Sequence, residues 1–283
     1  MNTSSCFHRN ILPAMLHYFG YFAAIFIGLS LGIMGGGGSI LTVPVLVYLM
    51  GVSPVLSTAY SLFIVGSTSL VGTAGYFRKG LVALPTALVF LGPSLLTVFL
   101  TRKVLVPAIP HELFTLGHLV FTKDLLVLVA FAVLMVAAAT SMIRSKTAAA
   151  ADDAPLAATN YPLVLTIGAV VGLLTGFVGA GGGFLIIPAL VLFARLPMKL
   201  AVGTSLVIIA LNSLIGFTGD LSAGRAMDWP FLLGFLTFAL GGIVLGTYLA
   251  RFIPGAKLKP AFGWFTLAMG TFILTKELLF HHA

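Results

Sequence analysis

The sequence predicts an all-α protein: a polytopic transmembrane helical bundle of about 8–10 membrane segments, arranged as two inverted repeats with glycine-broken, re-entrant helices. Hydrophobic residues make up 59% of the chain and charged residues only 8%, with a mean hydropathy of +1.14, whereas soluble domains are about a quarter charged. No Asp, Glu, Lys or Arg occurs between Arg9 and Arg78 or between Asp153 and Arg195. Each interval is long enough for several spans of about 20 apolar residues. The uninterrupted apolar runs exclude the alternating pattern of a membrane β-barrel.

An internal duplication underlies the two repeats. The stretch 28–75 aligns with the stretch 172–219 without a gap, at an offset of 188 − 44 = 144 residues between Pro188 and Pro44. Of the 48 aligned positions 18 are identical, and they include Gly, Pro and Ser, which a shared apolar composition alone would not place in register. Each copy carries a glycine run within apolar sequence, at 35–38 in the first and at 179–183 in the second. Function is therefore expected at paired glycine breaks.

Apolar runs bounded by turn residues predict five segments in each half. Those of the first half are 11–34, 39–50, 54–77, 81–101 and 124–143, and those of the second are 161–178, 184–194, 200–219, 229–250 and 260–280. Segments 39–50 and 184–194 hold about 12 and 11 residues, and at 1.5 Å per residue they reach only about half-way through the hydrocarbon core. We interpret them as short helices that each follow a break.

These segments divide the chain into four regions: an N-terminal tail (1–10), a first membrane repeat (11–143), a polar linker (144–160) and a second membrane repeat (161–283). The linker is interpreted as solvated because it combines small and polar residues with Pro155 and charges. The other sizeable loop, 102–123, contains Pro107 and Pro110 and could carry a surface helix. Arg102 is counted among the loop charges.

The odd number of segments per repeat predicts inversion. The second copy then enters the membrane upside down relative to the first, as in many secondary transporters. With the N-terminus outside, nine Lys and Arg residues fall on the side of Arg78 and Arg144, and six fall on the side of Arg102. This bias favours the first side as cytoplasmic. If the glycine runs are re-entrant tips, they approach each other near the membrane midplane from opposite sides.

Glycine runs at membrane depth predict functional breaks. Each Gly costs about 1 kcal/mol in a helix relative to Ala, and lipid offers no water to freed backbone groups, so a break survives only inside protein or beside a wet cavity. The short helices that begin near Ser39 and Phe184 expose N–H groups and the positive end of the helix dipole, which together form an anion site. The competing interpretation, close helix packing, is expected for the isolated pairs Gly28/Gly32 and Gly172/Gly176.

The third segment of each repeat adds neutral hydrogen-bonding groups. Ser61 and Ser205 occupy equivalent positions of the two copies, and Asn212 is the most polar group deep in an uncharged span. Intramembrane polar residues are functional candidates, although each hydroxyl could simply bond its own helix backbone. The predicted substrate-binding residues are Gly35, Gly36, Gly37, Gly38, Ser39, Ser61, Gly179, Gly181, Gly182, Gly183, Thr204, Ser205 and Asn212.

The remaining residues narrow the class of function. All seven acidic residues fall in loops or near segment ends, so no carboxylate is expected at the midplane, and a metal-cation carrier or carboxylate proton relay is disfavoured. The chain has neither a Gly-x-x-x-x-Gly-Lys-Ser/Thr loop nor a His-Glu-x-x-His motif, and we expect no enzyme, cofactor or metal. Scattered basic loop residues argue against nucleic acid despite the net charge of +8. Lys199 and Arg195 could attract an anion or be ordinary loop charges.

Taken together, these motifs resemble the TauE/SafE family, the sulfite exporter (TSUP) group of bacterial and archaeal permeases. The resemblance covers about residues 20–280 and rests on the two glycine-rich signatures that lead to Pro44 and Pro188, on Ser-Leu at 61–62 and Gly-Thr-Ser-Leu at 203–206, and on the polar linker. It implies movement of sulfur-containing oxyanions or organosulfonates, such as sulfite or sulfoacetate, across the inner membrane.

We therefore expect a multi-pass cell-membrane transporter of a small anion, sulfite or a sulfonate, that works by alternating access as one repeat rocks against the other. Membrane lipid is an expected partner, as is a coupling ion if transport is coupled, whereas no motif fixes that ion, the direction or the oligomeric state. The alternatives are an anion channel and a non-transporting membrane accessory subunit.

Overall fold

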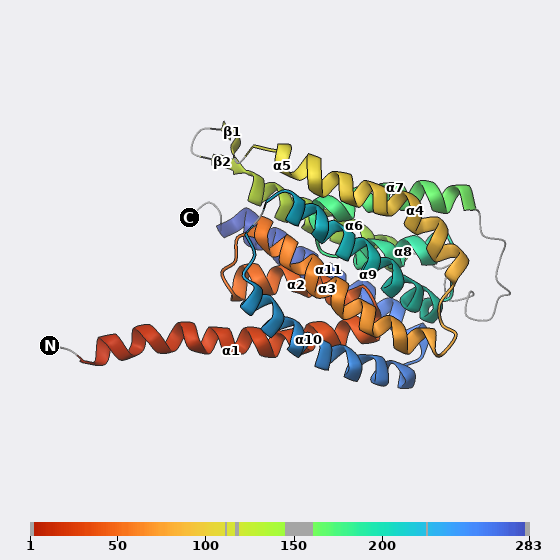
Figure 1. Ribbon diagram of the computed structural model, residues 1–283, viewed down its shortest axis with the longest axis horizontal. Helices are drawn as coiled ribbons and strands as arrows, with labels where there is room; N and C mark the ends of the chain where they lie inside the picture. Colours follow the sequence, from red (N-terminus) through yellow and green to blue (C-terminus); the bar gives the residue numbers. More distant parts are fainter. Residues whose placement is uncertain (1–2, 111, 117–118, 145–160, 225, 281–283) are drawn as a thin grey trace.

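The described part of the chain forms a bundle of long helices around two short ones (Figure 1). The computed structural model describes residues 3–110, 112–116, 119–144, 161–224 and 226–280. The first half contains α1 (Thr3–Met34), α2 (Gly37–Pro44), a π-helical segment (Val45–Leu49), α3 (Pro54–Phe77), α4 (Leu84–Leu100), a second π-helical segment (Thr101–Leu105), α5 (Val106–Ala108), β1 (Glu112–Leu116), β2 (Leu119–Thr122) and α6 (Lys123–Arg144). The second half contains α7 (Tyr161–Val178), α8 (Gly183–Leu192), α9 (Met198–Ser222), α10 (Trp229–Leu249), a 3₁₀ turn (Ala250–Phe252) and α11 (Gly255–Phe280).

Six helices of the described part are long and apolar enough to cross a membrane. They are α3, α4 with its continuation to Ala108, α6, α7, α9 and α10. Large apolar side chains on these helices face outward, and Leu88, Leu96 and Val244 are each more than half exposed. Such side chains suit contact with lipid tails. The predicted all-α, polytopic membrane bundle is confirmed.

The N-terminal helix begins earlier than predicted. α1 starts at Thr3 rather than at residue 11, so most of the expected tail is helical, and Figure 1 shows this end of α1 extending beyond the other helices. At the opposite end of the first repeat α6 ends at Arg144. The predicted linker lies, from residue 145 to residue 160, outside the described residues.

The first break is shorter than the glycine run that predicts it. The chain turns at Gly35, whose φ of +62° lies in the left-handed region that glycine adopts without steric cost. α2 begins at Gly37, two residues earlier than expected. Gly38 is already helical, and a Cβ added there would lie 2.6 Å from the backbone nitrogen of Leu31. This glycine therefore allows α2 to pack closely on α1 and does not break the helix.

The second break spans residues 179–182 and separates α7 from α8. α8 has 10 residues, which reach about 15 Å at 1.5 Å per residue, or half of a hydrocarbon core of about 30 Å. Pro188 lies inside α8, and Pro44 ends α2 just before the π-helical segment. Both short helices therefore follow a break, as predicted, and α2 continues through the π-helical segment to Leu49.

Glycines bring two helix pairs into backbone contact at opposite edges of the bundle (Figure 1). α7 lies along α4, where a Cβ added at Gly172 would lie 2.6 Å from the carbonyl oxygen of Ser94. α1 lies along α10, where a Cβ added at Gly32 would lie 2.6 Å from the backbone nitrogen of Thr247. The packing role expected for the isolated glycine pairs is confirmed. At the offset of 144 residues α1 corresponds to α7 and α4 to α10, so the two contacts are counterparts.

α3 and α9, which also correspond to each other, pack together between these edges. Gly66 of α3 lies against Leu214, and Gly216 of α9 lies against Leu62. Residue numbers rise along α3 as they fall along α9, so the two helices are antiparallel. α6 and α11 form a further packed pair.

The loop between α4 and α6 differs from the surface helix considered above. α4 continues through its π-helical segment into α5, after which β1 and β2 pair as an antiparallel hairpin, with Thr115 opposite Val120 and Leu116 opposite Leu119. A helix between residues 109 and 122 is therefore wrong for the part of this loop that the structure describes. Pro110 disfavours helical backbone in the residue before it, and the aromatic and β-branched residues that follow favour strands.

Candidate functional site

The two glycine breaks meet backbone to backbone. A Cβ added at Gly36 would lie closer than 3.0 Å to the carbonyl carbon, carbonyl oxygen and Cα of Gly183. A Cβ added at Gly183 would likewise be closer than 3.0 Å to the Cα of Gly36. Real Cβ contacts of this length essentially never occur, so neither position has room for a side chain. The two breaks thus approach each other as expected, and their depth in the membrane stays a prediction.

Both short helices begin at this contact, α2 after Gly36 and α8 after Gly182. The first N–H groups of a helix have no carbonyl four residues back to bond, and the helix dipole adds partial positive charge. Ser39 directs its hydroxyl to the break itself, because its Oγ donates to the carbonyl oxygen of Gly36 at 2.6 Å. The backbone N–H of Ser39 bonds the same carbonyl at 3.2 Å, so the free N–H groups of α2 are expected in its first two residues, Gly37 and Gly38.

α9 places two buried serines against the breaks. A Cβ added at Gly35 would lie 2.8 Å from the Oγ of Ser205, and one added at Gly181 would lie 3.1 Å from the Oγ of Ser213. Ser205 donates its hydroxyl to the carbonyl oxygen of Val202 at 2.8 Å. The Oγ of Ser213 has no hydrogen-bond partner among the described residues, and it was not in the predicted set, although its repeat partner Ser69 marks it as an equivalent position.

The other predicted polar residues separate into two groups. Ser61 is fully buried and its Oγ has no partner in the described part of the chain. Asn212 donates through Nδ2 to the Oγ of Ser94 at 2.6 Å, while its Oδ1 is unpaired in the same part of the chain. Thr204 instead accepts from the backbone nitrogen of Ala83 at 2.9 Å. It fixes the connection between α3 and α4 to α9, which is a structural contact.

Two predicted glycines face the helix that precedes their break. Gly37 lies against the side chain of Met34 at the end of α1, and Gly182 lies against the side chain of Thr175 in α7. The Oγ1 of Thr175 is buried without a hydrogen-bond partner among the described residues. These glycines therefore define the shape of each turn, whereas Gly36 and Gly183 define the contact between the turns.

Arg102 is a functional candidate that the sequence analysis placed in a loop, and that placement is wrong. Its side chain is fully buried. Its Nη1 donates to the Oγ1 of Thr58 at 3.0 Å and lies 3.2 Å from the Oδ2 of Asp220. The guanidinium lies against Gly179, the first residue of the second break, where a Cβ would overlap it. The helical continuation of α4 through residues 101–105 carries Arg102 into the bundle.

Asp220 lies near a segment end, as expected of the acidic residues, but it is not exposed there. α9 continues to Ser222 and buries Asp220 completely. The duplication gave no signal for this ion pair, because Asp220 corresponds to Tyr76 (76 + 144 = 220) and Arg102 corresponds to Gly246 (102 + 144 = 246). The two charges lie at the ends of segments that are neighbours only in the fold, so the sequence did not pair them.

A basic pocket opens at the opposite end of α3. It has a volume of about 170 Å³ and is lined by Tyr76, Lys79, Leu81, Lys199, Val202, Ala250, Arg251 and Leu258; we call it the basic vestibule. Three lining side chains are cationic and none is acidic. Val202 also lies against Gly35, and Tyr76 donates its hydroxyl to the carbonyl oxygen of Gly32 at 2.9 Å. The vestibule therefore adjoins the first break through Val202 and the preceding turn of α1 through Tyr76.

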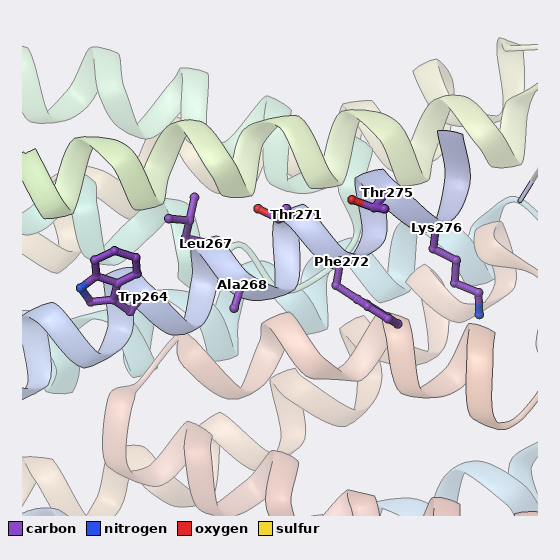
Figure 2. A pocket seen from close by; sticks show the side chains of 7 residues that line it. All are labelled: Trp264, Leu267, Ala268, Thr271, Phe272, Thr275 and Lys276. Atoms are coloured by element: carbon purple, nitrogen blue, oxygen red, sulfur yellow. The ribbon is translucent and has the colours of Figure 1, made fainter. Parts of the chain in front are cut away.

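A larger pocket, of about 750 Å³, lies away from the breaks along α11. Figure 2 shows that its lining side chains come from this one helix, from Trp264 to Lys276. Trp264 and Phe272 are more than half exposed, as expected for a surface that faces lipid. No predicted site residue lines it, so this pocket is not the candidate site.

The donors at the breaks suit an anion. They are backbone N–H groups, hydroxyls and a guanidinium, whereas cations such as Ca²⁺ and Mg²⁺ take oxygen ligands, many of them carboxylates. No group of three or more His, Cys, Asp or Glu residues in the described ranges is placed to hold a metal ion. These donor types are chemically suited to a small oxyanion.

Comparisons with known proteins agree with a transport role. The sequence profile of the family described as "Sulfite exporter TauE/SafE" matches residues 21–273. A "Probable membrane transporter protein" of Xylella fastidiosa (strain 9a5c) is 30% identical over 254 residues, which are 89% of this chain and 92% of that protein. The "Probable membrane transporter protein YunE" of Bacillus subtilis (strain 168) is 39% identical over 85 residues, which are 30% of this chain and 31% of that protein. No solved structure matches the chain significantly.

Proposed function

The chain belongs to the sulfite exporter TauE/SafE family, and from this premise we propose that it is a secondary carrier of a small sulfur-containing anion, sulfite or an organosulfonate. Its relatives are named as membrane transporters, and the chain is a multi-pass membrane protein. The observation that carries the proposal is the backbone contact between Gly36 and Gly183. It brings the beginnings of two broken helices together beside buried hydroxyls.

The chemistry of this contact favours an oxyanion over a cation. Helix N-termini attract negative charge through free N–H groups and the dipole. Ser61 and Ser213 add hydroxyls that have no other partner among the described residues, and the amide of Asn212 lies on the same helix as Ser213. These neutral groups add hydrogen bonds to an anion without adding further charge, so release remains easy. The proposed site comprises these residues and the glycines of both breaks.

We propose inverted repeats and alternating access as the mode of transport. Three features support the inversion: the sequence register at an offset of 144 residues, the counterpart contacts α1–α10 and α7–α4, and the antiparallel course of α3 and α9. The basic vestibule leads to the first break from one face, while the buried pair of Arg102 and Asp220 fills the region beside the second break. This asymmetry fits a carrier that is accessible from one face at a time.

The basic vestibule is the proposed entrance on the cytoplasmic side. Lys79 and Lys199 belong to the more basic set of loops, which the positive-inside rule assigns to the cytoplasm. Placing Arg102 inside the bundle removes one charge from the opposite set, so nine against six becomes nine against 6 − 1 = 5. The bias toward this orientation therefore increases.

Uptake into proteoliposomes tests the proposal. The purified protein is reconstituted, and entry of radiolabelled sulfite is followed with sulfoacetate, thiosulfate or sulfate as unlabelled competitors, with and without a pH gradient. We expect saturable uptake that one competitor suppresses. Flux that rises without saturation would instead support the anion channel. Sulfite flux equal to that of empty vesicles, with the same result when each of the other three anions carries the label, would overturn the transport proposal and leave the accessory-subunit alternative.

Neutralising the basic vestibule is expected to weaken anion capture. Lys199→Gln and Arg251→Gln should each raise the KM for uptake about three- to fivefold at low salt, because one unit charge near the path changes the energy of an arriving anion by about 1 kcal/mol. The difference should shrink at high salt, where exposed charges are screened. The maximal rate should stay within twofold of the unmodified value, because these side chains do not touch the breaks.

Lys276→Gln provides the matched control for the vestibule variants. Lys276 lies near the end of α11 opposite Leu258, and its Nζ stacks 3.6 Å from the centroid of the Tyr48 ring. The Lys276→Gln variant also removes one positive charge, but at a site distant from the vestibule, so it should leave the KM unchanged. An equal rise in KM for all three variants would show that general surface charge, and not the vestibule, attracts the anion.

A further inference from the structure

We propose that the guanidinium of Arg102 binds the transported anion, and that Asp220 forms an ion pair with this guanidinium when no anion is bound. This inference rests on the proposed function, because it names the cationic ligand of the carrier's site. The guanidinium is fully buried between three parts of the fold: Thr58 of α3, Asp220 of α9 and Gly179 of the second break. Arginine presents a planar set of donors that matches the geometry of oxyanions.

Correspondence between the two halves places Arg102 on the transport path. Tyr76 and Val202 line the basic vestibule. Their counterparts at the offset of 144 residues are Asp220 (76 + 144) and Thr58 (202 − 144), and both of these contact Arg102. The guanidinium therefore fills, in one half, the place that corresponds to the open vestibule in the other. An anion that leaves the breaks toward this face meets Arg102.

The geometry of the ion pair leaves room for exchange. The Nη1 of Arg102 lies 3.2 Å from the Oδ2 of Asp220, which is longer than the roughly 2.7–2.9 Å of a strong charge-assisted hydrogen bond. Taking both charges out of water is costly, and apolar residues can often replace such a pair without loss of stability. A buried pair beside a helix break is therefore poorly explained by stability alone. An anion that takes the place of Asp220 keeps the guanidinium neutralised, and the displaced carboxylate has to turn toward water or a cation to avoid an unpaired buried charge.

Two buried hydroxyls without a partner in the described residues lie on the helices that contact Arg102. Ser61 follows Thr58 by one helical turn on α3, so both lie on the same face. Its Oγ is buried without a partner in the described residues. Further along, Gly181 of the second break lies against the equally unpaired Ser213. Ser61 and Ser213 are therefore further donors on α3 and α9, the two helices that also hold Thr58 and Asp220 against Arg102.

The charge-neutral double variant Arg102→Gln/Asp220→Asn tests the inference. It removes both buried charges together, so a merely structural pair would be replaced without an orphaned charge. We expect this variant to insert and to elute from gel filtration like the unmodified protein. It should lose at least nine-tenths of sulfite uptake and the anion-dependent rise in melting temperature that ligand binding to the folded state produces. Retention of both properties within twofold would overturn the inference.

Two single variants keep the inference testable if the double variant does not fold. Asp220→Asn removes the competitor, and the sulfite concentration that gives half of the thermal shift should fall about tenfold. Arg102→Lys keeps the charge but loses the planar donor set, and the same concentration should rise about tenfold. Lys103→Gln, which removes a neighbouring exposed charge, is the control and should change neither value. Unchanged half-saturation in both single variants would contradict anion binding at Arg102.

Failure of the inference is distinguishable from failure of the proposed function. If the unmodified protein neither takes up nor is stabilised by sulfite, sulfoacetate, thiosulfate or sulfate, the proposed function falls and the role of Arg102 falls with it. If the unmodified protein transports one of these anions and the double variant does so equally well, the transporter stands. In that case Arg102 and Asp220 form a structural pair only.

Discussion

Replacing Gly36 with alanine is expected to slow transport severely while the protein still inserts into the membrane. The new Cβ would fall closer than 3.0 Å to three backbone atoms of Gly183, and backbone atoms have no rotamer that moves them aside. Overpacking of this kind costs about 1–3 kcal/mol, and here it falls on the contact between the two breaks. Because about 1.4 kcal/mol corresponds to a tenfold change in rate, we expect the uptake rate to fall about ten- to a hundredfold.

Gly183→Ala and Gly92→Ala complete this experiment. Gly183→Ala introduces the same overlap from the opposite repeat and should reproduce the loss. A Cβ at Gly92 in α4 would have no neighbour within 4 Å, so Gly92→Ala should transport normally and could gain stability, since Ala is the better helix former. Uptake is normalised to reconstituted protein, and gel filtration reports assembly. Normal uptake by Gly36→Ala and Gly183→Ala, or altered assembly with no change in uptake, would favour the accessory-subunit alternative.

The position of the breaks could be predicted because glycine runs have no apolar substitute. Apolar residues can replace one another in a membrane span. The alignment of the two repeats nevertheless keeps Gly, Pro and Ser at matching positions, which indicates that the backbone requires these residues there. The bounds of α3, Pro54–Phe77, agree with the predicted segment, since Pro54 sets φ for the first turn of a helix. From the sequence we could expect only that the two glycine runs approach each other. The specific contact between Gly36 and Gly183 depends on how the two repeats pack together.

The roles of individual glycines could not be predicted from the run itself. Gly35 and Gly38 look alike in the sequence, yet Gly35 adopts a φ of +62° and turns the chain, whereas Gly38 is helical and packs on Leu31. The difference comes from α1, which lies beside one of them. The sequence around the glycine run does not show which of its residues will pack against α1.

Arg102 was missed for a related reason. In the sequence it follows an apolar run and precedes Lys103, which is the usual pattern of a loop that leaves the membrane. Its burial depends on the helical continuation of α4 and on Asp220, which lies 118 residues further along the chain. Charges that neutralise each other across such a separation cannot be recognised from composition, and the repeat comparison does not help because their counterparts are Tyr76 and Gly246.

Gly181→Ala is expected to remove transport, and Gly80→Ala provides a closely matched comparison. Both glycines adopt a left-handed backbone, with φ of +68° at Gly181 and +67° at Gly80, so each alanine variant carries a similar strain of about 1–2 kcal/mol. A Cβ at Gly80 would have no neighbour within 4 Å, whereas one at Gly181 would lie 2.6 Å from the Cγ1 of Val65 and 3.1 Å from the Oγ of Ser213. Only Gly181→Ala displaces groups of the proposed site.

The comparison separates stability from function because the backbone strain is shared. Melting temperatures in detergent should fall in both variants, while sulfite uptake should fall at least about tenfold in Gly181→Ala and remain near normal in Gly80→Ala. Equal uptake in the two variants would mean that the surroundings of Ser213 do not take part in transport. Equal loss would mean that strain anywhere in the bundle slows the cycle. Loss confined to Gly181→Ala assigns the requirement to the space beside the second break, where a transported anion needs room that a methyl group would fill.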